Sequence, residues 1–143
     1  MKFRFREFVF LVLIFFVVSF VYEISHSGLY DWEREPLKND FGFKVNRLLL
    51  STFGDVFALS VIFFFVSLIN KNFNWIRKFR FVDYLIVIFI GVGFAIFWEI
   101  RAQIQEKWFY GPLMPTVFGL GVTSLIQIPI CFFVSVWVFR KIV

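Results

Sequence analysis

The sequence predicts an all-α membrane protein with four transmembrane helices. Three observations carry this prediction. Of the 143 residues, 60% are apolar and 24% aromatic, and the mean hydropathy is +0.82, whereas a typical soluble domain is about half apolar and one quarter charged. Four apolar runs can each cross a hydrocarbon layer of about 30 Å, which needs roughly 20 helical residues. The basic residues form short clusters beside these runs.

The four apolar runs are Phe8–Ile24, Leu48–Ile69, Phe81–Ile100 and Val117–Phe139. Backbone polar groups inside a bilayer must bond to one another, so these runs are helices unless they close a barrel. They lack the alternation of polar and apolar residues that a barrel strand requires. The first run also resembles a secretory signal peptide, with a basic start and small residues at Ser25–Ser27. A repeated pattern described below argues against its removal.

The basic clusters predict the orientation of the chain. Nine lysines and arginines lie before the first run, between the second and third runs, or after the fourth. The positive-inside rule places these segments in the cytoplasm. The other six basic residues are accompanied by acids such as Asp31 and Glu33. We therefore expect a multi-pass protein of the cell's inner (plasma) membrane with both termini cytoplasmic.

A short pattern occurs twice, 76 residues apart. Tyr22-Glu23-Ile24, Trp32 and Pro36-Leu37 form the first copy, and Trp98-Glu99-Ile100, Trp108 and Pro112-Leu113 form the second. A weaker match relates residues 64–67 to 132–135, both Phe-Phe-Val-Ser. Together they indicate a tandem duplication of a helical hairpin, with repeats at 1–70 and 71–143 inserted in the same direction. Short connections then predict a four-helix bundle of antiparallel neighbours.

Glu23 and Glu99 close their apolar runs, so both acids are expected near the outer boundary of the membrane. Two interpretations stay open there. Carboxylates at this depth can simply meet water beside an aromatic belt that includes Trp98 and Trp108. Acids within a transmembrane segment are otherwise functional-site candidates by default. Opposed carboxylates can hold a proton between them or attract a cation.

The neighbours of these two acids favour a site. Glu99 and Gln103 are separated by four residues and share one helix face, while Glu23 and His26 are three residues apart and do the same. The Glu-His pair is able to share a proton or a metal. A dinuclear carboxylate centre would need a second such pair, and the second repeat has Ala102 in place of His26. No metal site and no cofactor are therefore expected.

Asp55 lies deeper in the second run, where an ionised acid needs a partner or a proton. Ser51 shares its face, and Gln127 on the fourth run is expected nearby. A hydrogen-bond network that only holds helices together and a polar pathway are both consistent with this pattern. The single cysteine, Cys131, lies in the fourth run and is expected to be a small packing residue.

The connection after the third run is short and apolar. Residues 108–115 are expected to re-enter the membrane or lie on the outer leaflet, and Arg101 to reach lipid head groups. The candidate ligand-binding residues are Glu23, His26, Asp55, Glu99, Arg101, Gln103, Trp108 and Gln127.

Three functions remain open at this point. The leading hypothesis is a small membrane protein that binds or conducts a cation, proton or polar ligand in an outward-facing pocket lined by acids from both repeats. The first alternative is a membrane-embedded enzyme that acts on a lipid or isoprenoid at the outer leaflet, with Glu23 and Glu99 as acid and base. The second is an accessory or assembly subunit without chemistry of its own.

The expected partner is the lipid bilayer, together with a further copy of the chain or another membrane protein. The net charge of +5 does not indicate a nucleic-acid partner, because the basic clusters lie beside membrane spans, where they set topology and contact anionic lipids. No phosphate-binding glycine loop, nucleophile elbow or zinc motif occurs in the sequence.

Overall fold

A computed structural model describes residues 5–34 and 40–143. Within that part the chain forms four long helices: α1 (Phe5–His26), α2 (Phe41–Asn70), α3 (Phe81–Ile104) and α4 (Val122–Ile142). Each is long and apolar enough to cross a membrane. The predicted all-helical architecture with four candidate spans is therefore confirmed. Within the repeated pattern, Pro36 and Leu37 lie outside the described residues, as do Lys2 and Arg4 of the first basic cluster.

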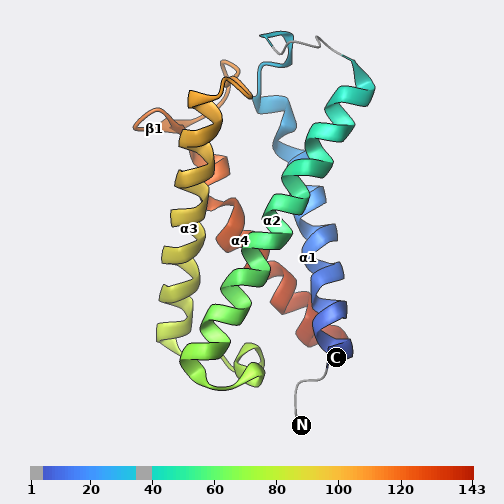
Figure 1. The fold of residues 1–143 in the computed structure, drawn as a ribbon, viewed down its shortest axis with the longest axis vertical. Helices are drawn as coiled ribbons and strands as arrows, with labels where there is room; N and C mark the ends of the chain where they lie inside the picture. The colour runs from blue at the N-terminus through green and yellow to red at the C-terminus, as the bar shows by residue number, and fades with distance from the viewer. Residues whose placement is uncertain (1–4, 35–39) are drawn as a thin grey trace.

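The helices run up, down, up and down along one bundle (Figure 1). α1 packs against α2 and α4, and α3 packs against α4. We call the end where α1 begins, α4 ends and residues 71–80 connect α2 to α3 the terminal end. We call the other end, which carries residues 27–34 and 105–121, the loop end. α2 and α3 approach each other at the terminal end and diverge toward the loop end (Figure 1).

Short elements join these helices. Three 3-10 helices cover Ser27–Leu29 (η1), Trp32–Arg34 (η2) and Phe73–Arg77 (η3). Two-residue strands, β1 (Thr116–Val117) and β2 (Leu120–Gly121), pair as a small antiparallel hairpin. The two loop-end segments are also tied together. The Asp31 amide donates to the Phe109 carbonyl at 2.8 Å and the Gly111 amide to the Leu29 carbonyl at 2.7 Å.

Local chemistry explains where the structure departs from the predicted spans. α2 begins at Phe41, seven residues before the predicted Leu48, because the Asp40 side chain accepts a hydrogen bond from the Phe43 amide at 2.9 Å and caps the helix. α4 begins at Val122 rather than at the predicted Val117. Phe118 and Gly119 adopt positive φ, 52° and 78°, which turns the chain and prevents an earlier helical start.

The apolar core fills the terminal half of the bundle. Phe15 of α1, Ile62 and Phe63 of α2 and Phe132 of α4 are each 0% exposed. Their rings pack at tilted angles, as between Phe15 and Phe132, with centroids 5.6 Å apart. Burying side chains of this size contributes about 1.5–3 kcal/mol each.

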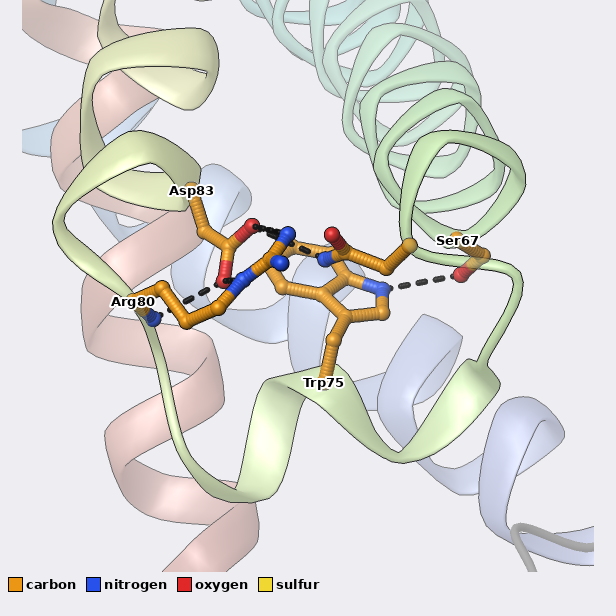
Figure 2. A network of polar contacts seen from close by, with 5 residues as sticks. Ser67, Trp75, Arg80 and Asp83 are labelled. Carbon is orange, nitrogen blue, oxygen red and sulfur yellow. Dashed lines mark hydrogen bonds and ion pairs between the residues drawn. The ribbon is translucent and has the colours of Figure 1, made fainter.

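The 3-10 helix η3 closes the terminal end. Trp75 and Ile76 are buried, and the Trp75 ring stacks on Phe132 with centroids 5.8 Å apart. Figure 2 shows how the segment is held: the Trp75 Nε1 donates to the Ser67 hydroxyl at 2.8 Å, and the Arg80 amide donates to the Asp83 carboxylate at 2.8 Å. Asp83 thereby caps α3, whose first turn it occupies.

Further contacts tie η3 to the ends of the other helices. Asn70 Nδ2 donates to Asp83 at 2.8 Å, which links the end of α2 to the start of α3. Arg140 Nε donates to the Ile76 carbonyl at 2.5 Å, and Arg77 pairs with Glu7 at 3.1 Å. The terminal end is therefore held by hydrogen bonds from all four helices.

Small residues of α3 lie against α4. Gly91, Ala95 and Ala102 are buried, and a Cβ atom added at Gly91 would lie 3.0 Å from the Pro129 ring. The absence of a side chain at Gly91 thus allows α3 to approach α4 closely. On the opposite surfaces, large apolar side chains remain exposed every four residues, such as Leu13, Val17 and Val21 on α1. Such stripes suit a lipid environment.

A cavity at the loop end of the bundle

A cavity of about 360 Å³ opens at the loop end, with walls from all four helices and from both loop-end segments. Its size falls within the usual range of small-molecule sites. Polar and charged side chains in its lining are Glu23, Arg47, Ser51, Asp55, Glu99, Arg101, Lys107, Ser124 and Gln127. Aromatic side chains in its lining are Tyr30, Trp32, Trp98 and Trp108. The cavity ends above the apolar core of Phe15, Phe63 and Phe132.

Gln127 bridges two of the acids. Its Nε2 atom donates to Glu23 Oε1 at 2.6 Å and to Asp55 Oδ2 at 2.5 Å. The Ser51 hydroxyl donates to the same Glu23 oxygen at 2.6 Å. This set, which we call the acid pair with its bridging amide, joins α1, α2 and α4. Both carboxylate oxygens contact one nitrogen atom, so they lie within about 5 Å of each other, as two acceptors of one amide group do.

The acid pair lies inside the protein without a compensating cation. Glu23 is 6% exposed and Gln127 5%, while Asp55 is half-buried on the cavity wall. In the described ranges, neither Glu23 nor Asp55 forms an ion pair with a lysine or an arginine. Burying a charge without a partner costs several kcal/mol, and like charges in one site oppose ionisation of both groups.

Glu99 forms a second acid position on another wall of the same cavity. It is 4% exposed, and its Oε2 accepts a short hydrogen bond from the Tyr110 hydroxyl. Ser124 and Trp108 also interact with this carboxylate. The Tyr110 hydroxyl in turn accepts from the Gly121 amide at 2.8 Å and from Gln103 Nε2 at 3.2 Å. Tyr110 therefore fixes Glu99 to the loop that follows α3.

Two tyrosines beside Glu99 are held in their neutral form. Burial raises the pKa of Tyr110 to about 12, and its hydrogen bond to Glu99 acts in the same direction. Burial also raises the pKa of Tyr30, and the negative charge of Glu99 adds to that shift. The Tyr30 hydroxyl lies 2.7 Å from the Ser124 hydroxyl. Both phenols are thus hydrogen-bonding groups, not charges, throughout the neutral pH range.

Cations lie on the loop-end side of the acids. Along α2, Arg47 is one helical turn beyond Ser51 and two beyond Asp55 toward the loop end. Its guanidinium donates to the Lys107 carbonyl and stacks over the Trp108 ring at 5.8 Å. Arg101 stacks over Trp98 at 5.3 Å. The lining thus changes from cationic and aromatic at the loop end to acidic and amide-bearing farther inside.

The structure brings six of the eight predicted residues to this one cavity: Glu23, Asp55, Glu99, Arg101, Trp108 and Gln127. The other two, His26 and Gln103, are not part of the cavity lining. His26 forms no hydrogen bond to Glu23, and it interacts electrostatically with Glu99. Its Nδ1 donates to the Tyr22 carbonyl at 2.9 Å, and its ring packs between Tyr22 and Tyr30. Gln103 donates to the Gly119 carbonyl at 2.8 Å and supports the β hairpin.

Tyr30, Arg47, Tyr110 and Ser124 also contribute to the cavity or to its acids, and sequence reasoning did not select them as site residues. The sequence could have indicated Tyr110. It lies in a connection too short and apolar to leave the bundle, so it must fold back over the end of α3. The sequence could not have indicated Arg47 and Ser124, because their role depends on how far each helix is rotated about its axis.

Polar groups continue beneath the acid pair. Ser19 lies one turn from Glu23 on the same face of α1 and is 0% exposed. Cys131, one turn below Gln127, is buried and interacts with Ser19. Among the described residues, no group of three or more His, Cys, Asp or Glu side chains has the arrangement to hold a metal ion.

Comparisons with known proteins found no relative of this chain: no family model, no curated protein and no solved structure matches it.

Proposed function

We propose that the chain is a small membrane protein that binds the cationic or polar group of a ligand in an outward-facing pocket. The observation that carries this proposal is the cavity at the loop end. It combines carboxylates from α1, α2 and α3 with an amide from α4, and none of these acids pairs with a lysine or an arginine within the described residues. Carboxylates without a counter-ion attract a cation or a hydrogen-bond donor.

The proposed orientation follows from the basic residues. Arg6, Lys71, Lys78 and Lys141 belong to the clusters at the terminal end, where α1 begins and α4 ends (Figure 1). The positive-inside rule then places that end in the cytoplasm and both termini with it. The loop end and its cavity would face outward from the cell's inner (plasma) membrane.

The packing favours binding over conduction through a single copy of the chain. Between the cavity and the terminal end, the interior is filled by Phe15, Phe63 and Phe132, and Trp75 closes the bundle beneath them. A hydrated ion would have to displace this apolar core, at a cost of several kcal/mol for losing its solvation shell. The proposed pocket therefore opens to one side of the membrane.

The duplication of a helical hairpin is part of the same proposal. Glu23 and Glu99, the equivalent acids of the two repeats, are both buried and both line the cavity. Their partners differ: Glu23 accepts from Gln127 and Ser51, whereas Glu99 accepts from Tyr110. We propose that the repeats have diverged so that each acid holds a different part of one ligand.

Intrinsic fluorescence tests the proposed function, because Trp32, Trp98 and Trp108 line the cavity. Protein in lipid nanodiscs would be titrated with Na⁺, K⁺, methylammonium and ethanolamine at constant ionic strength. We expect a saturable change with at least one of these probes, and a half-saturation concentration raised about tenfold or more in Glu99→Gln and Asp55→Asn.

Glu106→Gln is the matched control, since Glu106 is exposed and outside the cavity lining. It should bind as the unmodified protein does. The proposal fails if none of the four probes gives a saturable response, or if the acid variants and the control respond alike.

One observation supports a second candidate, an enzyme acting on an outer-leaflet lipid or isoprenoid. Leu50 lines the cavity and is 59% exposed, and Arg101 on the opposite wall is exposed too. A lipid whose acyl chain lies between α2 and α3 could therefore place its head group against the acids, with Glu99 and Glu23 as acid and base.

Mass spectrometry of nanodisc lipids and added polyprenyl phosphates would detect a product that the Glu99→Gln variant does not form. Unchanged lipids after incubation with the unmodified protein would exclude this candidate for the lipids supplied.

A further inference from the structure

We propose that the ligand of the loop-end cavity is a phosphate ester with a primary ammonium group two carbons away. The ethanolamine phosphate group of a phospholipid and free phosphoethanolamine both have this chemistry. The ammonium group would bind at the acids inside the cavity, and the phosphate at the cations nearer the loop end. This ligand class rests on the proposed function, because the ammonium group occupies the site proposed there for a cation. It goes further by naming an anionic group on the same ligand.

Cations and acids line the same cavity without neutralising each other. Arg101 of α3 and Lys107 of the loop that follows form no ion pair with a carboxylate within the described residues. Glu23 and Asp55, on the same wall farther inside, pair with no lysine or arginine of the described chain. A ligand that carries both charges in the reverse order would complement both parts of the wall.

The second helix shows the order of these charges. Arg47, Ser51 and Asp55 of α2 are spaced four residues apart and all line the cavity, so each lies about 6 Å from the next along the helix axis. The cation is at the loop end of this row, and the acid is about 12 Å farther inside. An ethanolamine phosphate group with a hydrogen bond of about 2.9 Å at each end spans a distance of the same order.

Two arginines of the lining stack on indole rings that also line the cavity. Arg47 lies over Trp108 at 5.8 Å, and Arg101 lies over Trp98 at 5.3 Å. Stacking uses the face of a guanidinium group and leaves the N–H groups at its edge able to donate. The Arg101 side chain donates no hydrogen bond within the described ranges. Such an edge matches two oxygens of a phosphate, and Lys107 adds a further positive charge.

The groups farther inside are acceptors that suit a primary ammonium group, which has three N–H bonds to donate. Glu23, Asp55 and Glu99 come from three different helices and line the cavity. Gln127 lines it too, and its Oε1 atom, unlike its Nε2 atom, forms no hydrogen bond within the described chain. A quaternary ammonium group, as in choline, has no N–H bond to offer these acceptors. We therefore expect the site to prefer ethanolamine to choline.

The cavity also has a side along which an acyl chain can leave. Leu50 of α2 lines it and is 59% exposed, and Arg101 on the α3 side is exposed as well. Gly54 adds no side chain to this wall, and a Cβ atom there would meet nothing within 4 Å. The helices α2 and α3 diverge toward this end (Figure 1). A lipid head group can thus enter between them while its acyl chains stay in the bilayer.

Tryptophan fluorescence tests this ligand class with probes that each lack one feature. Protein in phosphatidylcholine nanodiscs would be titrated with phosphoethanolamine, ethanolamine, inorganic phosphate, phosphocholine and β-alanine at constant pH and ionic strength. Ethanolamine lacks the phosphate, inorganic phosphate lacks the ammonium group, phosphocholine has no N–H bond, and β-alanine has a carboxylate in place of the phosphate. We expect phosphoethanolamine to half-saturate the response at a concentration about tenfold or more below that of each other probe.

Variants assign each charge of the ligand to its site. Arg101→Gln should raise the half-saturation concentration of phosphoethanolamine about tenfold and leave that of ethanolamine unchanged, whereas Asp55→Asn should raise both. Arg34→Gln is the matched control, because Arg34 is an arginine of the loop end outside the cavity lining. The comparison among probes uses the unmodified protein, so it does not depend on the folding of any variant.

Nanodiscs that contain phosphatidylethanolamine distinguish the two sources of this group. If the lipid is the ligand, these nanodiscs should weaken the response to added phosphoethanolamine, and the lipid should stay bound to the protein in native mass spectrometry. If the soluble compound is the ligand, the response should be the same in both kinds of nanodisc.

Three results would overturn the proposal. Equal affinities for phosphoethanolamine and ethanolamine would remove the phosphate site and leave the proposed cation pocket intact. Equal affinities for phosphoethanolamine and inorganic phosphate, without a response to any cation probe, would overturn this ligand class and the proposed function together. A protein that neither responds to phosphoethanolamine nor retains phosphatidylethanolamine would also contradict this ligand class, and a response to a cation probe would then still support the proposed function.

Discussion

Gln127 on α4 and Glu23 on α1 are joined by a hydrogen bond of 2.6 Å although 104 residues separate them in the sequence. The same Gln127 nitrogen reaches Asp55 on α2 at 2.5 Å. One amide therefore holds three helices at the depth where the apolar core gives way to the cavity. Within a bilayer no water competes for these groups, so their arrangement affects both the stability of the bundle and the properties of the site.

Replacing Gln127 with leucine should destabilise the bundle. The change removes both hydrogen bonds and leaves Glu23 and Asp55 with fewer donors, which costs about 1–3 kcal/mol for each buried group left unsatisfied. Reversible unfolding in mixed detergent micelles would measure the free energy. Gln105→Leu is the control, because Gln105 is exposed at the end of α3. Equal stabilities for the two variants would show that the bridging amide does not hold the helices together.

The contact between α3 and α4 makes a prediction for two glycines on one helix. Gly91→Ala would place a Cβ atom 3.0 Å from the ring of Pro129, whereas the position of a Cβ at Gly93 is open. Both changes improve helix propensity by the same amount, so their difference reports packing alone. Overpacking costs about 1–3 kcal/mol, and we expect Gly91→Ala to be less stable than Gly93→Ala by that amount. A Gly91→Ala protein as stable as the Gly93→Ala protein would mean that the two helices separate without cost.

Tyr110 should make the stability of the protein depend on alkaline pH. Its pKa is raised from 10 to about 12 in the folded state. A raised pKa means that the folded protein binds the phenolic proton more tightly than the unfolded chain does. The stabilisation is complete below pH 10 and is lost as the pH rises toward about 12. In the Tyr110→Phe variant, the free energy of unfolding should depend less on pH in this range. The ultraviolet titration of tyrosinate should also lose the contribution of one tyrosine that ionises at high pH. An unaltered titration would show that Tyr110 ionises like an exposed tyrosine.

The length and composition of the apolar runs were enough to predict four spanning helices, because a bilayer permits few other structures. Their ends were predicted less well. α2 extends outward to its cap at Asp40, and α4 is shortened by the turn at Phe118 and Gly119. Both depend on side-chain capping and on backbone conformations that an apolar run does not report.

The candidate site was predicted from depth along each helix, which a rise of about 1.5 Å per residue provides. Depth placed Gln127 about one helical turn deeper than Asp55, close enough to be expected nearby, and the structure joins the two side chains. Depth could not show which faces meet, because that depends on helix rotation and crossing angle. For this reason His26, although on the same helix as Glu23, bonds to the Tyr22 carbonyl and not to Glu23.

A cysteine at Gly54 tests whether the acid-lined cavity is open to the outside. This residue lines the cavity beside Asp55, and a Cβ there meets nothing within 4 Å. Cys131, the native cysteine, would first be changed to alanine. Gly54→Cys in proteoliposomes of known orientation would then be treated with membrane-impermeant thiosulfonates, one cationic and one anionic. Gly93→Cys, also an open position but outside the cavity lining, is the control.

We expect the Gly54→Cys protein to react from the loop-end side, with the cationic reagent faster than the anionic one by about tenfold, as expected where local negative charge attracts a cation. Asp55→Asn should reduce this ratio. Reaction only from the terminal end, or equal rates for the two reagents with and without Asp55, would contradict the account.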